Sequence, residues 1–250
     1  MLEVNEIFGP TIQGEGKKIG TPSVFVRFGK CNMQCAGFEV EYETPSGIKK
    51  CSCDSYYASD IAFRDDWKKY ESSKPLIEEL NKLLPSYKVD IVLTGGEPLL
   101  YWNDIEFQKF MKYYIDYGYK ITIETNASLD IEFTQDWQKK ILFSMSVKLS
   151  NSGEPISKRI NKKALTNIIN FCTDSYLKFV VDANSLKNAE QEIDDIITQI
   201  PHCEVYLMPL GDTSEIIDIN SLSVIELALK KGYMYSDRLH IRVWNNKRGV

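Results

Sequence analysis

The sequence predicts an α/β fold, arranged as an incomplete TIM-like barrel of about six βα units. The first indication is that strand-like and helix-like runs alternate from about residue 75 onward. The second is that in residues 120–124 and 142–148 apolar and polar side chains alternate, so that each strand has one apolar face. The third is a set of polar residues near the carboxyl ends of these strands, where α/β folds place their active sites: Thr94, Glu124, Ser146 and Lys148.

The expected elements follow in chain order. Strands are predicted at residues 23–28, 90–94, 120–124, 142–148, 176–181 and 204–208. Helices are predicted at residues 75–84, 104–117, 162–171, 189–199 and 221–231, and a last extended run is predicted at 239–244.

Two segments follow neither the strand period nor the helix period of apolar residues. Residues 36–50 are charged and contain the turn Pro45-Ser46-Gly47, which is typical of an insertion. Residues 56–74 are rich in Tyr, Asp, Lys and Ser and are expected to form a second, irregular excursion. We expect both over the mouth of the barrel, within a single domain spanning residues 1–250, because no repeat or linker interrupts the chain.

Composition narrows the function class. The chain has 250 residues and a net charge of −5, which argues against a sequence-independent nucleic-acid binder. The first residues lack the basic start and apolar core of a signal peptide, and no apolar run reaches membrane-spanning length. We therefore expect a cytoplasmic protein, whose clustered cysteines act as ligands rather than as disulfides.

Four of the six cysteines lie close together near the N-terminus: Cys31, Cys35, Cys51 and Cys53. Four thiolates could hold a structural zinc ion, although these spacings differ from the usual two-residue zinc knuckle. The alternative is a [4Fe–4S] cluster on three thiolates, with one iron left open. Cys172 and Cys203 stand alone in apolar surroundings and are predicted to be buried.

A second motif, Gly95-Gly96-Glu97-Pro98, ends one predicted strand. A Gly-Gly turn after a strand is by itself a weak signal for anion binding. Together with Cys-x3-Cys after the first predicted strand, it makes the chain resemble the radical S-adenosylmethionine superfamily. There such glycines let the backbone approach the methionyl amine of S-adenosylmethionine.

Further segments are similar to the 7-carboxy-7-deazaguanine synthase family within that superfamily: residues 8–16, the strand with Arg27, Cys53-Asp54-Ser55, Glu124-Thr125-Asn126, Ser146-Val147-Lys148 and residues 208–212. The resemblance covers nearly the whole chain. It implies a lyase of queuosine biosynthesis, which converts 6-carboxy-5,6,7,8-tetrahydropterin to 7-carboxy-7-deazaguanine with loss of ammonia.

The resemblance also implies site residues. Cluster ligands would be Cys31, Cys35 and Cys53, with 36–52 as an insertion between them, an uncertain role for Cys51, and Ser55 on Mg²⁺. S-adenosylmethionine would contact Ser52, Cys53, Asp54, Gly95, Gly96, Glu97, Glu124, Ser146, Val147, Lys148 and Met208. The substrate would contact Ile12, Gln13, Gly14, Glu15, Arg27, Thr94, Trp244 and Val250. No catalytic side chain is implied beyond the cofactor radical.

Some of these positions have a second interpretation. Arg27 is expected to point inward, where it would bind a substrate carboxylate or form a structural ion pair. Ser55 could instead cap a turn or helix. Trp244 stands where the family often has a substrate-contacting histidine, and stacking of its indole on the pterin would replace the hydrogen bond of that histidine. His202 and His240 show no partner pattern, so no chemistry is assigned to them.

Two alternative functions remain open at this point. One is another radical S-adenosylmethionine enzyme, such as a glycyl-radical activase, and the other is a non-enzymatic zinc-binding module. The resemblance further implies an electron donor such as flavodoxin or ferredoxin, and a homodimer. Neither nucleic acid nor membrane is an expected partner.

Overall fold

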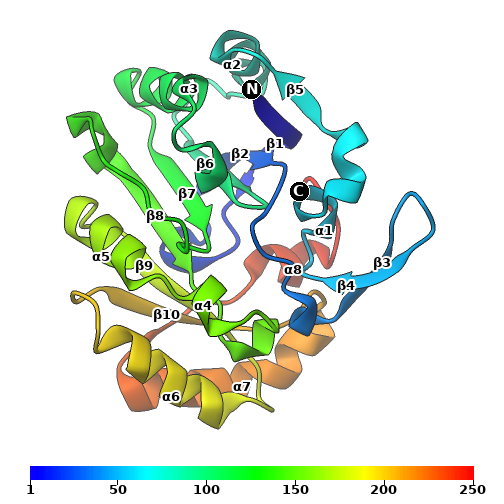
Figure 1. Cartoon of the computed structure of the whole chain (residues 1–250), viewed down its shortest axis with the longest axis vertical. Coiled ribbons are helices and arrows are strands. Elements are labelled where there is room, and N and C mark those ends of the chain that lie inside the picture. The colour runs from blue at the N-terminus through cyan, green and yellow to red at the C-terminus, as the bar shows by residue number, and fades with distance from the viewer.

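The computed structural model describes residues 1–250 and contains one large, curved sheet of nine strands (Figure 1). Six neighbouring strands are parallel and follow one another in chain order: β2 (Pro22–Phe28), β6 (Asp90–Gly95), β7 (Ile121–Thr125), β8 (Ile141–Ser146), β9 (Tyr176–Val181) and β10 (Glu204–Pro209). They correspond to the six predicted strands. The α/β class is thereby confirmed.

Three further strands extend the two edges of the parallel sheet. β1 (Leu2–Ile12) pairs antiparallel with β2, and β5 (Lys68–Tyr70) pairs antiparallel with β1. At the other edge β11 (Met234–Tyr235) pairs parallel with β10. The sequence pattern did not predict these three strands.

The longer helices cover the convex, outer side of the sheet (Figure 1). The longer ones are α2 (Ser73–Asn81), α3 (Ile105–Asp116), α5 (Lys162–Phe171), α6 (Leu186–Ile197) and α7 (Ser214–Lys231). Shorter ones are α1 (Tyr56–Ser59), α4 (Ile156–Arg159) and α8 (Leu239–Trp244), and 3₁₀ turns lie at Gly16–Lys18, Ala36–Phe38, Ile61–Asp66, Pro98–Tyr101, Asp136–Lys140 and Ser150–Ser152. The core lies between helices and sheet, where Phe107, Phe110, Phe143 and Phe179 are fully buried.

The structure corrects the prediction for residues 239–244, which form the helix α8 and not an extended run. Leu239, Ile241 and Val243 alternate as in a strand, but only Ile241 is buried and Val243 is 56% exposed. The backbone amide of Arg242 instead donates to the carbonyl of Arg238, and the amide of Asn245 to the carbonyl of Ile241. Since no strand edge is filled by this segment, helical hydrogen bonds satisfy its backbone.

The two irregular segments are also more ordered than expected. Residues 36–52 contain a hairpin of β3 (Val40–Glu43) and β4 (Lys49–Ser52), which projects from the main body (Figure 1). Residues 56–74 contain α1, a 3₁₀ turn, β5 and the start of α2. In addition, α7 begins at Ser214, seven residues before the predicted start at 221.

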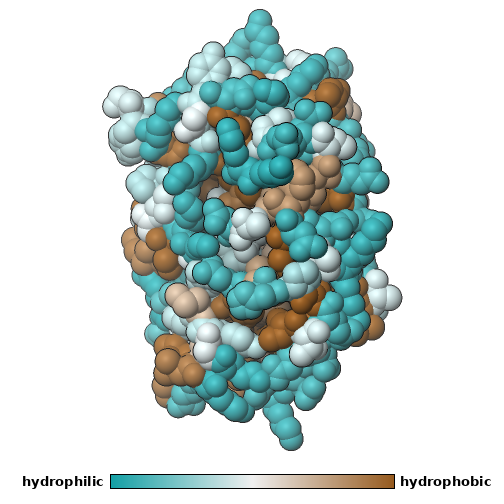
Figure 2. All heavy atoms as spheres, turned by 90° about the vertical axis from the view of Figure 1, so that its left-hand side faces the viewer, coloured by the Kyte–Doolittle hydropathy of each residue, from teal (hydrophilic) through white to brown (hydrophobic).

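The outer surface carries few large apolar areas. Figure 2 shows one side of the molecule as mainly hydrophilic, with apolar side chains in small groups. None of the helices combines the length and the hydrophobicity that crossing a membrane requires.

Candidate active site

A cavity of about 880 Å³ lies at the carboxyl ends of the parallel strands. Its volume is near the upper end of the range typical of small-molecule sites. Residues from β1, β2 and every strand from β6 to β10 line it, together with the β3–β4 hairpin, α1 and the last residues of the chain. Because the sheet curves around this space, segments far apart in sequence face one another across it.

Three of the four clustered cysteines line the cavity: Cys31, Cys35 and Cys53. Cys51 is exposed on β4 and does not line it. No three His, Cys, Asp or Glu side chains lie close enough in this structure to share one metal ion. Three separate thiols around one cavity fit the larger [4Fe–4S] cluster.

Burial controls the protonation of these thiols. It raises the pKa of Cys31 and Cys53 above the ordinary value and raises the pKa of Cys35 to about 12. Each of the three is therefore a neutral thiol in the chain alone. Because the metal ligand is the thiolate, binding of a cluster has to displace these protons.

The Gly95-Gly96 turn packs directly on the cysteine loop. A side chain at Gly96 would bring a Cβ within 1.9 Å of the Lys30 carbonyl oxygen, so only glycine fits. The amide of Gly96 donates to the Phe28 carbonyl (3.0 Å), and the amide of Glu97 donates to the Lys30 carbonyl (2.7 Å). The glycines are therefore needed first for backbone packing, although both also line the cavity.

Glu97 lies outside the cavity lining, contrary to the expectation of a cofactor contact. Its side chain is fully buried. The carboxylate accepts hydrogen bonds from the amide of Leu99 (3.0 Å), the hydroxyl of Thr125 (2.7 Å) and the amide of Asn126 (2.7 Å). Glu97 thus links the turn to the end of β7 as a structural group.

Two other expected cofactor contacts also lie outside the lining. Val147 is buried in the apolar core, and the buried hydroxyl of Ser52 donates to the carbonyl of Gln34. Lys148 does line the cavity; its ammonium donates to the Ser146 hydroxyl (2.9 Å) and has no carboxylate partner. An unpaired cation at this position can bind an anionic group of a ligand.

Across the cavity, Glu124 on β7 is held by two neighbours. The side-chain amide of Gln13 donates to Glu124 Oε1 (2.9 Å), and the hydroxyl of Thr94 donates to Glu124 Oε2 (2.7 Å). All three residues line the cavity, as predicted. Both carboxylate oxygens therefore have a fixed orientation.

Arg27 also lines the cavity, but it has a protein partner. Its Nε donates to Glu6 Oε1 (2.7 Å), and its guanidinium lies over the rings of Phe8 and Tyr57 at 5.6 and 5.7 Å. Its terminal nitrogen lies 3.4 Å from the Ser55 hydroxyl. Both interpretations of Arg27 are therefore compatible with its position.

The Ser55 hydroxyl lies in the cavity just before α1. It makes no capping hydrogen bond to that helix. The alternative role as a helix cap is therefore not realised. The hydroxyl lies between Arg27 and the Asp54 carboxylate, 3.4 Å from each.

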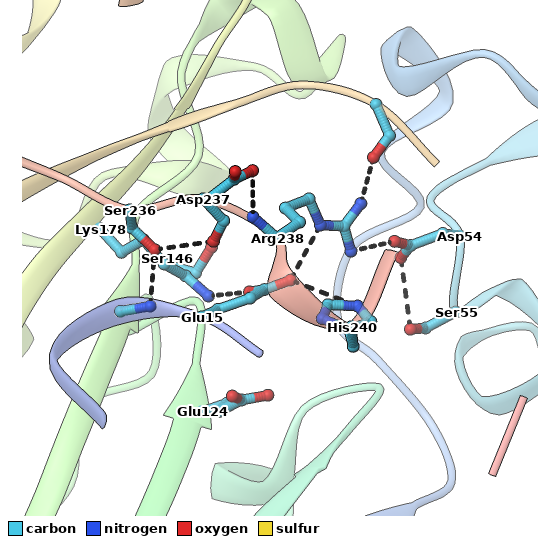
Figure 3. Close-up of polar contacts among 12 residues, drawn as sticks. Glu15, Asp54, Ser55, Glu124, Ser146, Lys178, Ser236, Asp237, Arg238 and His240 are labelled. Atoms are coloured by element: carbon cyan, nitrogen blue, oxygen red, sulfur yellow. Dashed lines mark hydrogen bonds and ion pairs between the residues drawn. The ribbon is translucent and has the colours of Figure 1, made fainter. Parts of the chain in front are cut away.

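Behind the Gln13 loop lies a network of buried charges that the sequence analysis missed (Figure 3). Arg238 Nε donates to Glu15 Oε1 (2.9 Å), and Arg238 also donates to Asp54 Oδ2 (2.6 Å). Lys178 on β9 forms an ion pair with the other oxygen of Glu15. Burial alone would raise the pKa of Glu15, but the charges of Lys178 and Arg238 hold that pKa well below its usual range.

One signal in the sequence could have identified Lys178. On β9 it lies two positions from Tyr176 and two from Val180, so the side chains of all three point to the same face of the sheet. A lysine on the inward face of a buried strand requires a partner, as was argued for Arg27. Arg238 follows no strand and gave no such signal.

The structure places His240, not Trp244, at the cavity. His240 lies against Gly14, with its Nε2 3.9 Å from Glu15 Oε1, whereas Trp244 lies outside the lining. The two residues are four positions apart in α8, so the substrate contact expected of Trp244 finds no support in the cavity lining and stays a prediction. Val250 does line the cavity, and the remaining predicted residues that line it are Ile12, Gly14, Glu15, Asp54, Ser146 and Met208.

Comparisons with known proteins agree with this site. No protein-family model matches the chain. The 7-carboxy-7-deazaguanine synthase of Halobacterium salinarum is 31% identical over 98% of this chain and 91% of its own length. That of Rhodopirellula baltica is also 31% identical, over 95% of this chain and 85% of its own. QueE from Escherichia coli has the same fold, with a TM-score of 0.68 and 19% identity over 96% of this chain and 94% of its own. The chain belongs to the 7-carboxy-7-deazaguanine synthase family.

Proposed function

We propose that this chain is a radical S-adenosylmethionine lyase that contracts the ring of 6-carboxy-5,6,7,8-tetrahydropterin, giving 7-carboxy-7-deazaguanine and ammonia. One observation carries the proposal. Three thiols and the Gly95-Gly96 turn line the same cavity as the Gln13 loop and Arg27. The sheet would act as a partial barrel that surrounds both ligands, with residues 36–52 as an insertion between cluster ligands.

The three cysteines, the Gly95-Gly96 turn and Lys148 would hold the cofactors. Cys31, Cys35 and Cys53 would bind the [4Fe–4S] cluster, and cluster and S-adenosylmethionine together supply one-electron radical chemistry when bound. Lys148 has a free positive charge for the methionyl carboxylate, and Ser146 holds its ammonium in place. The buried walls of the cavity keep water away from the reacting atoms.

A second group of residues that line the same cavity would hold the substrate. The guanidinium of Arg27 retains donors beyond the one that Glu6 occupies, and these fit a carboxylate. Gln13, Thr94 and Glu124 form a fixed row of polar atoms for the edge of the heterocycle. Lys178 and Arg238 orient the carboxylate of Glu15 from behind. The C-terminal Val250 lines the cavity as well.

Magnesium would bind at Ser55. Its hydroxyl lies beside Arg27 without a capping role, and Mg²⁺ prefers oxygen ligands that are completed by water and substrate. We expect added Mg²⁺ to increase turnover, and Ser55→Ala to blunt that increase while cluster content stays the same. Equal stimulation of both proteins would remove Ser55 from the metal site.

The one-electron chemistry requires an external donor, for which we propose flavodoxin or ferredoxin. We also propose a homodimer, supported by three well-exposed apolar side chains on one helix, α7: Ile219, Leu222 and Leu229. Sedimentation equilibrium of the full chain tests the dimer. A mass near 28.7 kDa at micromolar concentration would contradict it.

The central experiment is anaerobic reconstitution followed by turnover with 6-carboxy-5,6,7,8-tetrahydropterin and S-adenosylmethionine. We expect a brown protein that releases ammonia and 7-carboxy-7-deazaguanine. A brown protein that cleaves S-adenosylmethionine but leaves the pterin unchanged would indicate a different radical enzyme. A colourless protein would contradict the proposal.

A further inference from the structure

A carboxylate from a distant part of the chain holds the loop that carries Cys35. Glu154 Oε1 accepts hydrogen bonds from the backbone amides of Gln34 (2.5 Å) and Cys35 (3.0 Å). These contacts join residues 119 and 120 positions apart. The loop needs such support because Cys35 has a left-handed backbone (φ 52°), which is unfavourable for a residue with a side chain.

The same loop is held on its other sides. The Ser52 hydroxyl donates to the Gln34 carbonyl, so the backbone amide and the carbonyl of Gln34 both have hydrogen-bond partners. Gly37 packs so closely on the segment containing Glu154 that a Cβ there would lie 2.4 Å from the Asn151 carbonyl oxygen. The loop and residues 151–154 therefore form one packed unit.

Glu154 is itself fixed. Its side chain is only 7% exposed, and its second oxygen pairs with Lys158 Nζ at 2.9 Å. Arg159 donates to the backbone carbonyls of Glu154 (3.2 Å) and Lys148 (3.1 Å) and pairs with Glu192 (2.9 Å). This segment thus connects the Cys35 loop to Lys148 at the cavity.

The contacts of Glu154 matter for a bound cluster. Hydrogen bonds from backbone amides to cluster sulfur raise the reduction potential, and nearby negative charge lowers it. The amides of Gln34 and Cys35 are both directed to the carboxylate, whereas the amide of Met33 lies 3.4 Å from the sulfur of Cys31. Glu154 therefore occupies two amide donors of the cysteine loop and places beside Cys35 a carboxylate whose other oxygen is paired with Lys158.

We propose that Glu154 is a positioning residue, which fixes the conformation of the Cys35 loop and lowers the reduction potential of the bound cluster. The effect on the potential rests on the proposed function, because it requires Cys35 to be a cluster ligand. A low potential suits an enzyme that has to pass one electron to S-adenosylmethionine.

The first test measures amide hydrogen exchange in the full chain without a cluster. Glu154→Ala should speed exchange at Gln34 and Cys35 by roughly ten- to hundredfold, which corresponds to the loss of a charge-assisted hydrogen bond. Glu192→Gln is the matched control. Glu192 supports the same segment through Arg159 and the Ser150 amide but does not contact the loop. Unchanged exchange in Glu154→Ala, or an equal increase in the control, would overturn the positioning role.

The second test measures the midpoint potential of the reconstituted protein by redox titration followed by electron paramagnetic resonance. Glu154→Gln keeps an oxygen acceptor but removes the charge, so we expect unchanged iron content and a more positive potential. Glu192→Gln should retain the wild-type potential. An unshifted potential in Glu154→Gln, or the same shift in both variants, would refute the effect on potential. A wild-type chain that binds no cluster would overturn the proposed function and this effect together, while the exchange test would still decide the positioning role.

Discussion

Two groups of residues line the cavity and are held in different ways. The cysteine side comprises Cys31, Cys35, Cys53 and the Gly95-Gly96 turn, and the substrate side comprises the Gln13 loop with the charges around Glu15. The cysteine side consists of short motifs, in which backbone groups of Phe28, Lys30 and Gly96 contact one another directly. The substrate side consists of charged side chains from distant segments: Glu15 pairs with Lys178 and with Arg238, 163 and 223 residues further along the chain. A motif describes a local backbone, so it identified the glycine turn and the Gln13 loop but not the distant partners Lys178 and Arg238.

The energetics of the two sides differ as well. On the cysteine side, burial keeps the thiols neutral until metal binds, so the folded chain contains no unpaired thiolate there. On the substrate side, buried charges are already present and are compensated by one another. Removal of one residue should therefore abolish cofactor binding on the first side and lower the stability of the fold on the second.

The largest expected effect is on the cysteine side. Replacing Cys31, Cys35 or Cys53 by alanine should abolish cluster binding, because each would supply one of the three proposed ligands. Cys51→Ala should keep about four irons per chain, since this cysteine is exposed outside the cavity. Iron analysis and the visible spectrum after anaerobic reconstitution measure the cluster content of all four variants. Loss of the cluster in Cys51→Ala with retention in Cys53→Ala would reverse the ligand assignment.

The next effect concerns Arg238, at the centre of the charge network. Arg238→Met should lower the free energy of unfolding by about 3–5 kcal/mol, because Glu15 and Asp54 would lose their buried partner. Urea denaturation of the chain without a cluster measures this. The control is Lys112→Met, whose side chain and whose partner Asp116 are both about half exposed (50% and 54%) and which should cost only about 0–1 kcal/mol. Equal losses in the two variants would show that burial of the network does not matter.

A smaller, more specific effect is expected at Arg27. Arg27→Ala should raise the KM for the pterin by roughly ten- to hundredfold, while the cluster spectrum stays intact. Arg27→Lys should restore part of the affinity, because lysine lacks the planar, forked donors. Glu6→Gln is the control, since it weakens the ion pair but keeps the guanidinium. An unchanged KM in Arg27→Ala, with reduced stability in both variants, would leave Arg27 a structural role only.

The smallest effect is a dependence on pH. Burial lowers the pKa of His240 below its ordinary value of 6.5, although the Glu15 carboxylate opposes this. Below pH 6.5 the unfolded chain binds a proton that the folded chain does not, so stability falls as the pH decreases from about 7. His240→Gln should lose this part of the slope, as measured by urea denaturation at a series of pH values. A parallel slope in the variant would show that another group is responsible.

Local patterns were sufficient for the central part of the fold. The six parallel strands and five long helices could be predicted because each has its own period of apolar residues, and the positions of Tyr176–Val181 and Lys162–Phe171 agree to the residue. Residues 239–244 could not be predicted in this way. Their alternation resembles a strand, and the absence of a free sheet edge beside them is not visible in the sequence.

The sequence by itself determined the side chains available for chemistry: Cys31, Cys35 and Cys53, the Gly-Gly turn, Gln13 and Arg27. Only the tertiary structure decided which other residues join them. Cys51, Glu97 and Trp244 lie outside the cavity, whereas His240 lines it with Lys178 and Arg238. The physical reason is that a motif reflects backbone geometry over a few residues, while a buried charge is stable only beside partners that the whole sheet brings together.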